Sequence, residues 1–177
     1  MIKQNRYWFF VVAWVIGIYS TLSAVRPVCE LLKQNAWFAP GISLFLITLL
    51  IILSLGLIRG MPKKSLLSYF LLAGVLLCYI YGLVSIKYPE EKIHFLEYGF
   101  LAYLIYRALR LDCSRILSYA GAFILTTVFG WIDEGIQHIL PNRYYQNEDV
   151  FLNAISGALA LLLIFIFERE QLILGKK

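Results

Sequence analysis

The sequence is poor in charge: only 15% of its 177 residues are charged, whereas 60% are hydrophobic and the mean hydropathy is +0.74. An average soluble domain has about 25% charged residues, so a soluble globular domain is excluded. A membrane-spanning helix takes about 20 residues. The chain is therefore long enough for five or six spans and has no room for a separate soluble domain. We expect one integral membrane domain over residues 1–177.

Cysteine and recognised catalytic motifs are also scarce. Cys29, Cys78 and Cys113 are separated by long apolar runs and have no motif spacing, so neither a disulfide framework nor a zinc site follows. There is no Gly-x-Ser-x-Gly nucleophile motif and no phosphate-binding loop. The sequence also lacks a basic recognition helix, so we expect no nucleic-acid partner.

Six long apolar runs are present, and they predict an all-α, polytopic transmembrane bundle with about six spans. The first run follows Lys3 and Arg6, as a signal peptide would, but it is too long for a cleaved segment and is interpreted as a permanent span. The fourth and fifth runs carry acidic residues, so we expect them to face the bundle interior. The runs cover residues 7–25, 39–58, 66–86, 93–111, 116–132 and 150–167.

The distribution of Lys and Arg predicts the orientation, because cytoplasmic loops retain basic residues. One set of alternate connections, which includes both termini, has eleven basic and three acidic residues; the other set has five basic residues and, with the adjoining helix ends, eight acidic residues. Both termini are therefore predicted to be cytoplasmic. The first set is Lys3, Arg6, Arg59, Lys63, Lys64, Arg107, Arg110, Arg115, Arg169, Lys176 and Lys177; the second is Arg26, Lys33, Lys87, Lys92 and Arg143.

Polar side chains interrupt the fourth and sixth runs. His94 and Glu97 are three residues apart and share one helical face. Asp149 and Asn153 are four residues apart at the start of the sixth run. This stripe continues through small residues that allow a neighbouring helix to approach closely. The small residues are Ser156, Gly157 and Ala160.

The end of the fifth run carries two adjacent acids, Asp133 and Glu134. Adjacent residues point about 100° apart on a helix, so we expect only one of them to reach a central cleft. Two pairings four residues apart remain open: Asp133 with Gln137, and Glu134 with His138.

These three stripes are predicted to lie at one depth. With a rise of about 1.5 Å per residue, Asp133 lies roughly 27 Å from the cytoplasmic start of its run near Arg115. A hydrocarbon layer is about 30 Å thick, and the other two stripes enter from the same outer side. The sequence therefore predicts a polar pocket in the outer leaflet.

Structural explanations exist for several of these residues. Glu97 could have no role beyond fixing the packing of its helix. His94, taken alone, could be the hydrogen-bonding partner of a neighbouring acid. Arg143 could bind a phosphate or carboxylate through its planar guanidinium group, or it could pair with Glu148 or Asp149.

Four short motifs in order resemble the VanZ-like family of bacterial membrane proteins over residues 91–160, whereas the first ninety residues match only as generic spans. The departures are Glu91, where the family often has Asp, and Asn142, where it often has Gly. The motifs read Glu91-Lys92-Ile93-His94-Phe95, Asp133-Glu134-Gly135-Ile136-Gln137, Pro141-Asn142-Arg143, and Asp149 through Asn153 to Gly157. The resemblance implies a multi-pass protein of the bacterial cytoplasmic membrane with a role in the cell envelope, because the family's namesake accompanies resistance to the glycopeptide teicoplanin.

The first functional hypothesis is an intramembrane enzyme that acts on a membrane lipid or a lipid-linked envelope precursor. A histidine beside a carboxylate can move protons near neutral pH; alternatively, carboxylates and His94 could hold a divalent cation. The sequence identifies no definite metal site and no oligomeric state. The candidate catalytic residues are His94, Glu97, Asp133 and Glu134, and the candidate substrate-binding residues are Glu91, Lys92, Gln137, Arg143, Asp149 and Asn153.

Two other hypotheses use the same pocket differently. A non-catalytic binding or resistance protein would recognise an envelope precursor or an antibiotic through Gln137, Arg143 and Asn153. A small transporter would need polar groups that reach the cytoplasmic half of the bundle. That half offers chiefly Ser, Thr and Tyr, so we rank transport below the other two.

Overall fold

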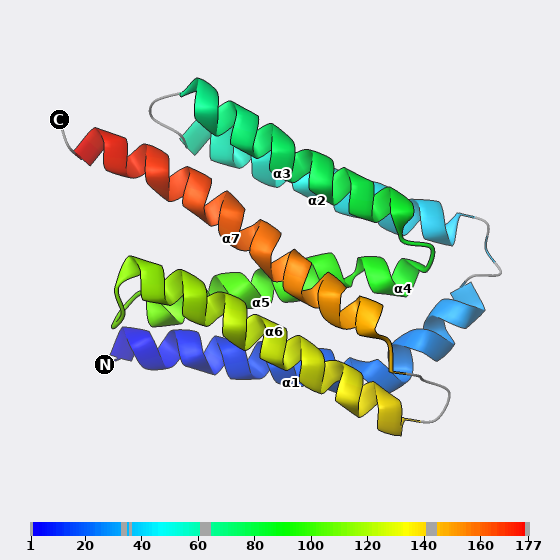
Figure 1. Cartoon of the computed structure of the whole chain (residues 1–177). Coiled ribbons are helices and arrows are strands. Elements are labelled where there is room, and N and C mark those ends of the chain that lie inside the picture. The colour runs from blue at the N-terminus through cyan, green and yellow to red at the C-terminus, as the bar shows by residue number, and fades with distance from the viewer. Residues whose placement is uncertain (1, 33–34, 36, 61–64, 141–144, 176–177) are drawn as a thin grey trace.

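The computed structural model describes residues 2–32, 35, 37–60, 65–140 and 145–175, and within these residues every regular element is a helix (Figure 1). The predicted all-α class is confirmed. Serine residues cap the N-termini of two helices. Ser65 Oγ accepts a hydrogen bond from the Ser68 amide at 3.1 Å, and Ser114 Oγ accepts one from the Leu117 amide at 3.4 Å. The helices are α1 (Ile2–Leu32), α2 (Phe38–Gly60), α3 (Leu66–Ser85), α4 (Pro89–Lys92), α5 (His94–Leu109), α6 (Arg115–Ile139) and α7 (Asn147–Gly175).

Five of these helices are long and apolar enough to cross a membrane, which identifies a membrane protein. They are the apolar segments of α1, α2, α3, α6 and α7. The predicted fourth span, residues 93–111, corresponds to α5, which has 16 residues and is preceded by the single turn α4. Sixteen residues rise about 24 Å, less than the hydrocarbon thickness of about 30 Å. By length and composition, α5 alone is therefore not a sixth span.

The short helix α5 lies inside the bundle, as expected for this run. It packs against α1, α6 and α7. Tyr98, Leu101 and Ile105 on α5 have no solvent-exposed surface. A helix that is covered on most sides contacts protein rather than lipid, so its sequence can carry polar residues that a lipid-facing helix would exclude.

Small residues let α5, α6 and α7 approach one another closely. A Cβ built on Gly157 of α7 would lie 2.9 Å from Thr126 Cγ2 of α6. A Cβ built on Gly99 of α5 would lie 3.5 Å from the Cβ of Ala160 on α7. The stripe that begins at Asn153 and passes through Gly157 is thus the packing face of α7, as its small residues predicted.

Two apolar cores flank this central contact. One joins α2 and α3 to α7 and includes Leu50, Leu72 and Tyr79. The other joins α1 and α6 to α5 and includes Val11, Leu101 and Ala122. Residues of α5 and α7 belong to both cores, so these two helices hold the α2–α3 pair against the rest of the bundle.

The bundle has two chemically different ends. In Figure 1, α1 begins and α7 ends at the same end of the molecule, where α2 and α5 also end and α6 begins. We call this the basic end, because Arg59, Arg107 and Arg115 lie in those helix termini. At the opposite end α5 and α7 begin and α6 ends; we call it the acidic end, for Asp133, Glu134 and Asp149.

Some residues used for the sequence predictions lie outside the described residues. Arg143 and the Pro141-Asn142-Arg143 motif are among them. So are five basic residues of the orientation count, Lys33, Lys63, Lys64, Lys176 and Lys177.

Candidate functional site

Three helix ends bring most of the predicted polar residues together at the acidic end. The side chains come from the end of α6 and the starts of α5 and α7, which pack against one another. Asp133, Glu134 and Asn153 have no exposed surface, and Gln137 and Asp149 are also buried. The predicted convergence of stripes is therefore present. We call the set Tyr98, Asp133, Glu134, Gln137, Asp149 and Asn153 the acidic cluster.

Tyr98 links α5 to α6 inside the acidic cluster. Its hydroxyl donates a hydrogen bond to Asp133 Oδ2 at 2.7 Å, and its side chain is fully buried. The hydroxyl fixes the orientation of a carboxylate that has no contact with bulk water. A buried carboxylate is costly unless hydrogen bonds stabilise it, so Tyr98 is a direct structural partner of Asp133.

His94 and Glu97 lie at the edge of the acidic cluster. His94 Nδ1 is 3.7 Å from Glu97 Oε2, and the His94 ring lies 5.7 Å from the Tyr98 ring, measured between centroids. The two side chains on this shared face are in contact. At this distance they form a salt bridge when the His94 ring is protonated. The Glu97 side chain is 22% exposed and that of His94 is 10% exposed. These two residues are therefore more accessible than the carboxylates behind them.

The pairings on α6 differ from both sequence alternatives. Gln137 Nε2 donates to Glu134 Oε1 at 2.9 Å, three residues away, rather than to Asp133. His138 is exposed, and its ring lies 6.5 Å from that of Tyr145 rather than against Glu134. On a helix, side chains three residues apart are as close as side chains four residues apart. Sequence spacing alone therefore could not choose between the two kinds of pair.

Both acids of α6 are buried, which corrects the expectation that only one reaches the interior. Asp133 faces α5 through Tyr98. Glu134 faces the segment that leads into α7, because its Oε2 accepts from the backbone amide of Gln146 at 3.2 Å. Two different elements thus cover two faces of α6 that point about 100° apart. The Gln146 side chain also donates to Asp149 Oδ2 at 3.4 Å, so Gln146 connects Glu134 with Asp149.

Asn153 is the least satisfied polar side chain of the acidic cluster. It is fully buried, and neither Oδ1 nor Nδ2 has a hydrogen-bond partner among the described residues. Each unsatisfied buried polar group costs about 1–3 kcal/mol. Gly130 of α6 makes this position possible, since a Cβ there would lie 2.7 Å from the Asn153 Cβ. The amide is therefore held in place between α6 and α7.

Lys92 contacts α2. The Lys92 ammonium donates to Ser43 Oγ of α2 at 2.9 Å, and the Lys92 side chain is only 9% exposed. Glu91 is partly buried. Of the predicted substrate-binding residues, Gln137, Asp149 and Asn153 belong to the acidic cluster. Lys92 instead contacts Ser43 of α2.

The acidic cluster forms no metal-binding arrangement among the residues that the structure describes. Within the described residues, no three His, Cys, Asp or Glu side chains are close enough together to hold a metal ion. The three cysteines lie at separate places: Cys29 is buried, Cys78 exposed and Cys113 partly buried.

Sequence reasoning missed three residues of the site. Tyr98 follows His94 by four residues, so the face that carries His94 also predicts Tyr98. Gln146 contributes mainly through its backbone amide, for which the sequence gives no signal. Gly130 precedes Asp133 by three residues and forms part of the same packing face of α6.

Comparisons of the chain with protein families, with curated proteins and with solved structures find no match.

Proposed function

We propose that this protein is a VanZ-like envelope protein of the bacterial cytoplasmic membrane, and that its acidic cluster is the active site of an enzyme for a lipid-linked or amphiphilic substrate. The observation that carries the proposal is the complete burial of Asp133 and Glu134 between three helices of a membrane protein. Ionisable residues inside a membrane are expensive and usually functional. The order of the motifs in residues 91–160 supports the relation to glycopeptide-resistance proteins.

The proposal requires six crossings and an acidic end that faces away from the cytosol. Helices α4 and α5 would form the sixth crossing together: Ile93 between them has helical angles, φ −66° and ψ −27°, and residues 89–109 rise about 30 Å. Both termini would then be cytoplasmic, as the basic end predicts.

This orientation can be tested by labelling single cysteines in a variant without the three native thiols. Lys87 at the acidic end and Asp112 at the basic end are both exposed. A membrane-impermeant maleimide should label Lys87→Cys in intact cells and Asp112→Cys only after permeabilisation. The reverse pattern would contradict the proposed orientation.

His94 and Glu97 are the proposed acid–base pair because they lie at the accessible edge of the cluster. A histidine with a carboxylate partner can accept and return a proton near neutral pH. Asp133, oriented by Tyr98, and Glu134, oriented by Gln137, supply carboxylate oxygens. Such oxygens accept hydrogen bonds from hydroxyl or amino groups, so the reacting part of the substrate would carry those groups.

The test of catalysis compares the two histidines of the chain. His94 is at the edge of the cluster and His138 is exposed. We expect membranes that contain the wild-type protein to change the envelope lipids detected by mass spectrometry. His94→Ala should lose this turnover by at least about a hundredfold, at unchanged folded yield, while His138→Ala retains it. Turnover by folded His94→Ala at the wild-type rate would overturn the catalytic assignment.

The Asn153 amide favours a second candidate, a non-catalytic protein that binds an envelope precursor or a glycopeptide antibiotic. Its two polar atoms have no partner among the described residues and are suited to ligand recognition. For this function, Asn153→Leu should weaken binding of the purified protein to envelope lipids, and no product should form with the wild type. Product formation would exclude a purely binding role.

A further inference from the structure

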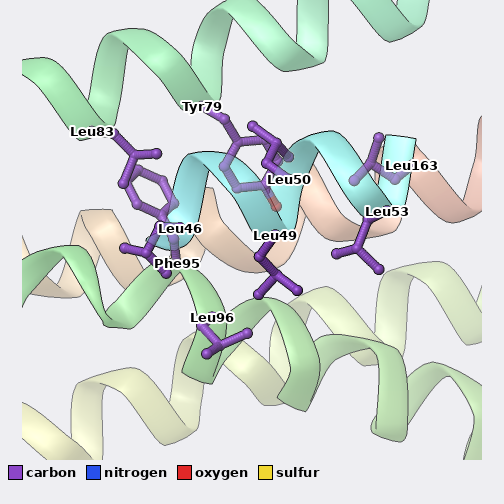
Figure 2. Close-up of a pocket in the computed structure, with 9 residues that line it drawn as sticks. All are labelled: Leu46, Leu49, Leu50, Leu53, Tyr79, Leu83, Phe95, Leu96 and Leu163. Carbon is purple, nitrogen blue, oxygen red and sulfur yellow. The ribbon is translucent and has the colours of Figure 1, made fainter. Parts of the chain in front are cut away.

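The chain contains a second candidate ligand site, on the other side of α5 from the acidic cluster. A pocket lies between α2, α3, α5 and α7 (Figure 2), with a cavity volume of about 70 Å³. Tyr79 is the one lining residue with a polar side-chain atom; all the others are Leu or Phe. The lining residues are Leu46, Leu49, Leu50, Leu53, Tyr79, Leu83, Phe95, Leu96 and Leu163.

The residues that line the pocket are spread along the bundle. Figure 2 shows Leu46, Leu83 and Phe95 grouped at one end and Leu53 and Leu163 at the other. From Leu46 to Leu53 the helix α2 rises about 10 Å. The first group is closer to the acidic end, because Phe95 is in the first turn of α5 and Leu83 is in the last turn of α3. The pocket therefore extends from the acidic end toward the middle of the bundle.

A positive charge lies about one helical turn from this pocket, toward the acidic end. Lys92 precedes Phe95 by three residues, and Ser43 precedes Leu46 by three residues, so the Lys92–Ser43 hydrogen bond of 2.9 Å lies about one turn beyond the pocket residues. Ser43 accepts one of the three N–H groups of the Lys92 ammonium. Among the described residues the other two have no acceptor.

We propose that the pocket binds one hydrocarbon chain of an anionic amphiphile, with its charged headgroup at Lys92. An apolar pocket at membrane depth is favourable for a lipid chain and unfavourable for water. The Lys92 ammonium, about one turn from the pocket, complements a phosphate or carboxylate. This inference rests on the proposed function and gives the class of its substrate. The hydrocarbon chain and the anionic group of the substrate lie on the α2 side of α5. The hydroxyl or amino groups of the substrate reach the acidic cluster.

The test uses the full-length protein in vesicles that contain phosphatidylglycerol with a photoreactive diazirine in one acyl chain. We expect saturable labelling of the α2 segment Leu46–Leu53 and of Leu96, with labelling removed by excess unlabelled phosphatidylglycerol. Phosphatidylcholine with the same diazirine should label these positions about fivefold less, since one lysine attracts an anionic lipid by that order. Lys92→Gln should remove this preference, while Lys87→Gln, at an exposed lysine, should retain it.

Pocket-filling variants separate a site from general lipid contact. Leu49→Trp and, independently, Leu96→Trp should lower the labelling about tenfold, because a well-filled space does not accept further groups without strain. The control is Leu44→Trp, at a residue that is 67% exposed on the same helix. The proposal would be overturned if labelling on every helix simply increased with the exposure of the residue and if the folded Leu49→Trp and Leu96→Trp variants were labelled like the wild type. Equal labelling of the wild type by the two lipids would also overturn it.

The same measurement distinguishes this inference from the proposed function. His94→Ala should leave the labelling unchanged, since His94 does not line the pocket. Normal labelling without turnover in the wild type would retain the lipid site and reject the enzyme. Turnover without saturable labelling would retain the enzyme and reject the lipid site.

Discussion

The two ends of the bundle contain buried or partly buried carboxylates in contrasting environments. At the basic end, Glu168 is 3.1 Å from Arg115 Nε and accepts hydrogen bonds from Tyr106 at 2.7 Å and Tyr119 at 3.3 Å. The side chains of Arg115 and Glu168 are 26% and 29% exposed. At the acidic end Asp133 and Glu134 are fully buried, and Asp133 accepts a hydrogen bond from the Tyr98 hydroxyl.

This difference separates a packing interaction from a candidate site. A carboxylate beside an arginine and two tyrosines needs no ligand, and its position is explained by the contacts between α5, α6 and α7. At the acidic end Asp133, Glu134 and Asp149 are buried in one cluster, and taking a carboxylate out of water is costly. Such an arrangement is usually kept for a function, and the following predictions test the distinction.

The largest expected effect is on turnover. Asp133→Asn and Glu134→Gln remove a charge without changing the side-chain shape, and each should lower turnover by at least about a hundredfold. Glu168→Gln, the matched change at the basic end, should leave turnover per folded molecule unchanged. The measurement is lipid mass spectrometry at equal folded yield. Equal losses at both ends would remove the distinction between them.

A smaller effect is expected on helix packing. Gly130→Ala should lower the free energy of unfolding by about 1–3 kcal/mol, because its Cβ would overlap the Cβ of Asn153 at 2.7 Å. Gly135 on the same helix has no atom within 4 Å of a built Cβ. Gly135→Ala should therefore be neutral or stabilising by up to about 1 kcal/mol. Thermal unfolding in detergent measures both, and a neutral Gly130→Ala would show that α6 and α7 are not held this closely.

Stability should depend on Arg115 at the basic end. Arg115→Leu leaves Glu168 without its charged partner and should cost about 1–2 kcal/mol, less than a fully buried pair because both side chains are partly exposed. The control is Arg107→Leu, at an exposed arginine that contacts Tyr7, for which we expect at most about 0.5 kcal/mol. Unfolding midpoints decide the comparison, and equal values for the two variants would contradict it.

The smallest effect compares two tyrosines that each donate to a carboxylate at 2.7 Å, Tyr98 to Asp133 and Tyr106 to Glu168. Removing either hydroxyl should destabilise the protein by about 1 kcal/mol. Only Tyr98→Phe should also lower turnover, by about tenfold, because it releases a carboxylate of the proposed site. If Tyr106→Phe lowers turnover as much, the hydroxyls act through stability alone.

The sequence by itself determined the membrane character, the helical class and the position of the polar stripes, because hydrophobicity and helical periodicity are local properties. It also predicted that His94 with Glu97, the end of α6 and the start of α7 would meet, since their depths follow from the helical rise. These predictions needed no knowledge of how each helix is rotated about its axis.

Only the tertiary structure decided the rotations and hence the partners. Tyr98 reaches Asp133, Gln137 donates to Glu134, and Lys92 turns to Ser43 on α2 instead of to the acidic cluster. Rotation about a helix axis is fixed by packing against several neighbours at once, here by close approach at small residues such as Gly130. A pattern within one segment limits which faces are polar, whereas packing selects what each face meets.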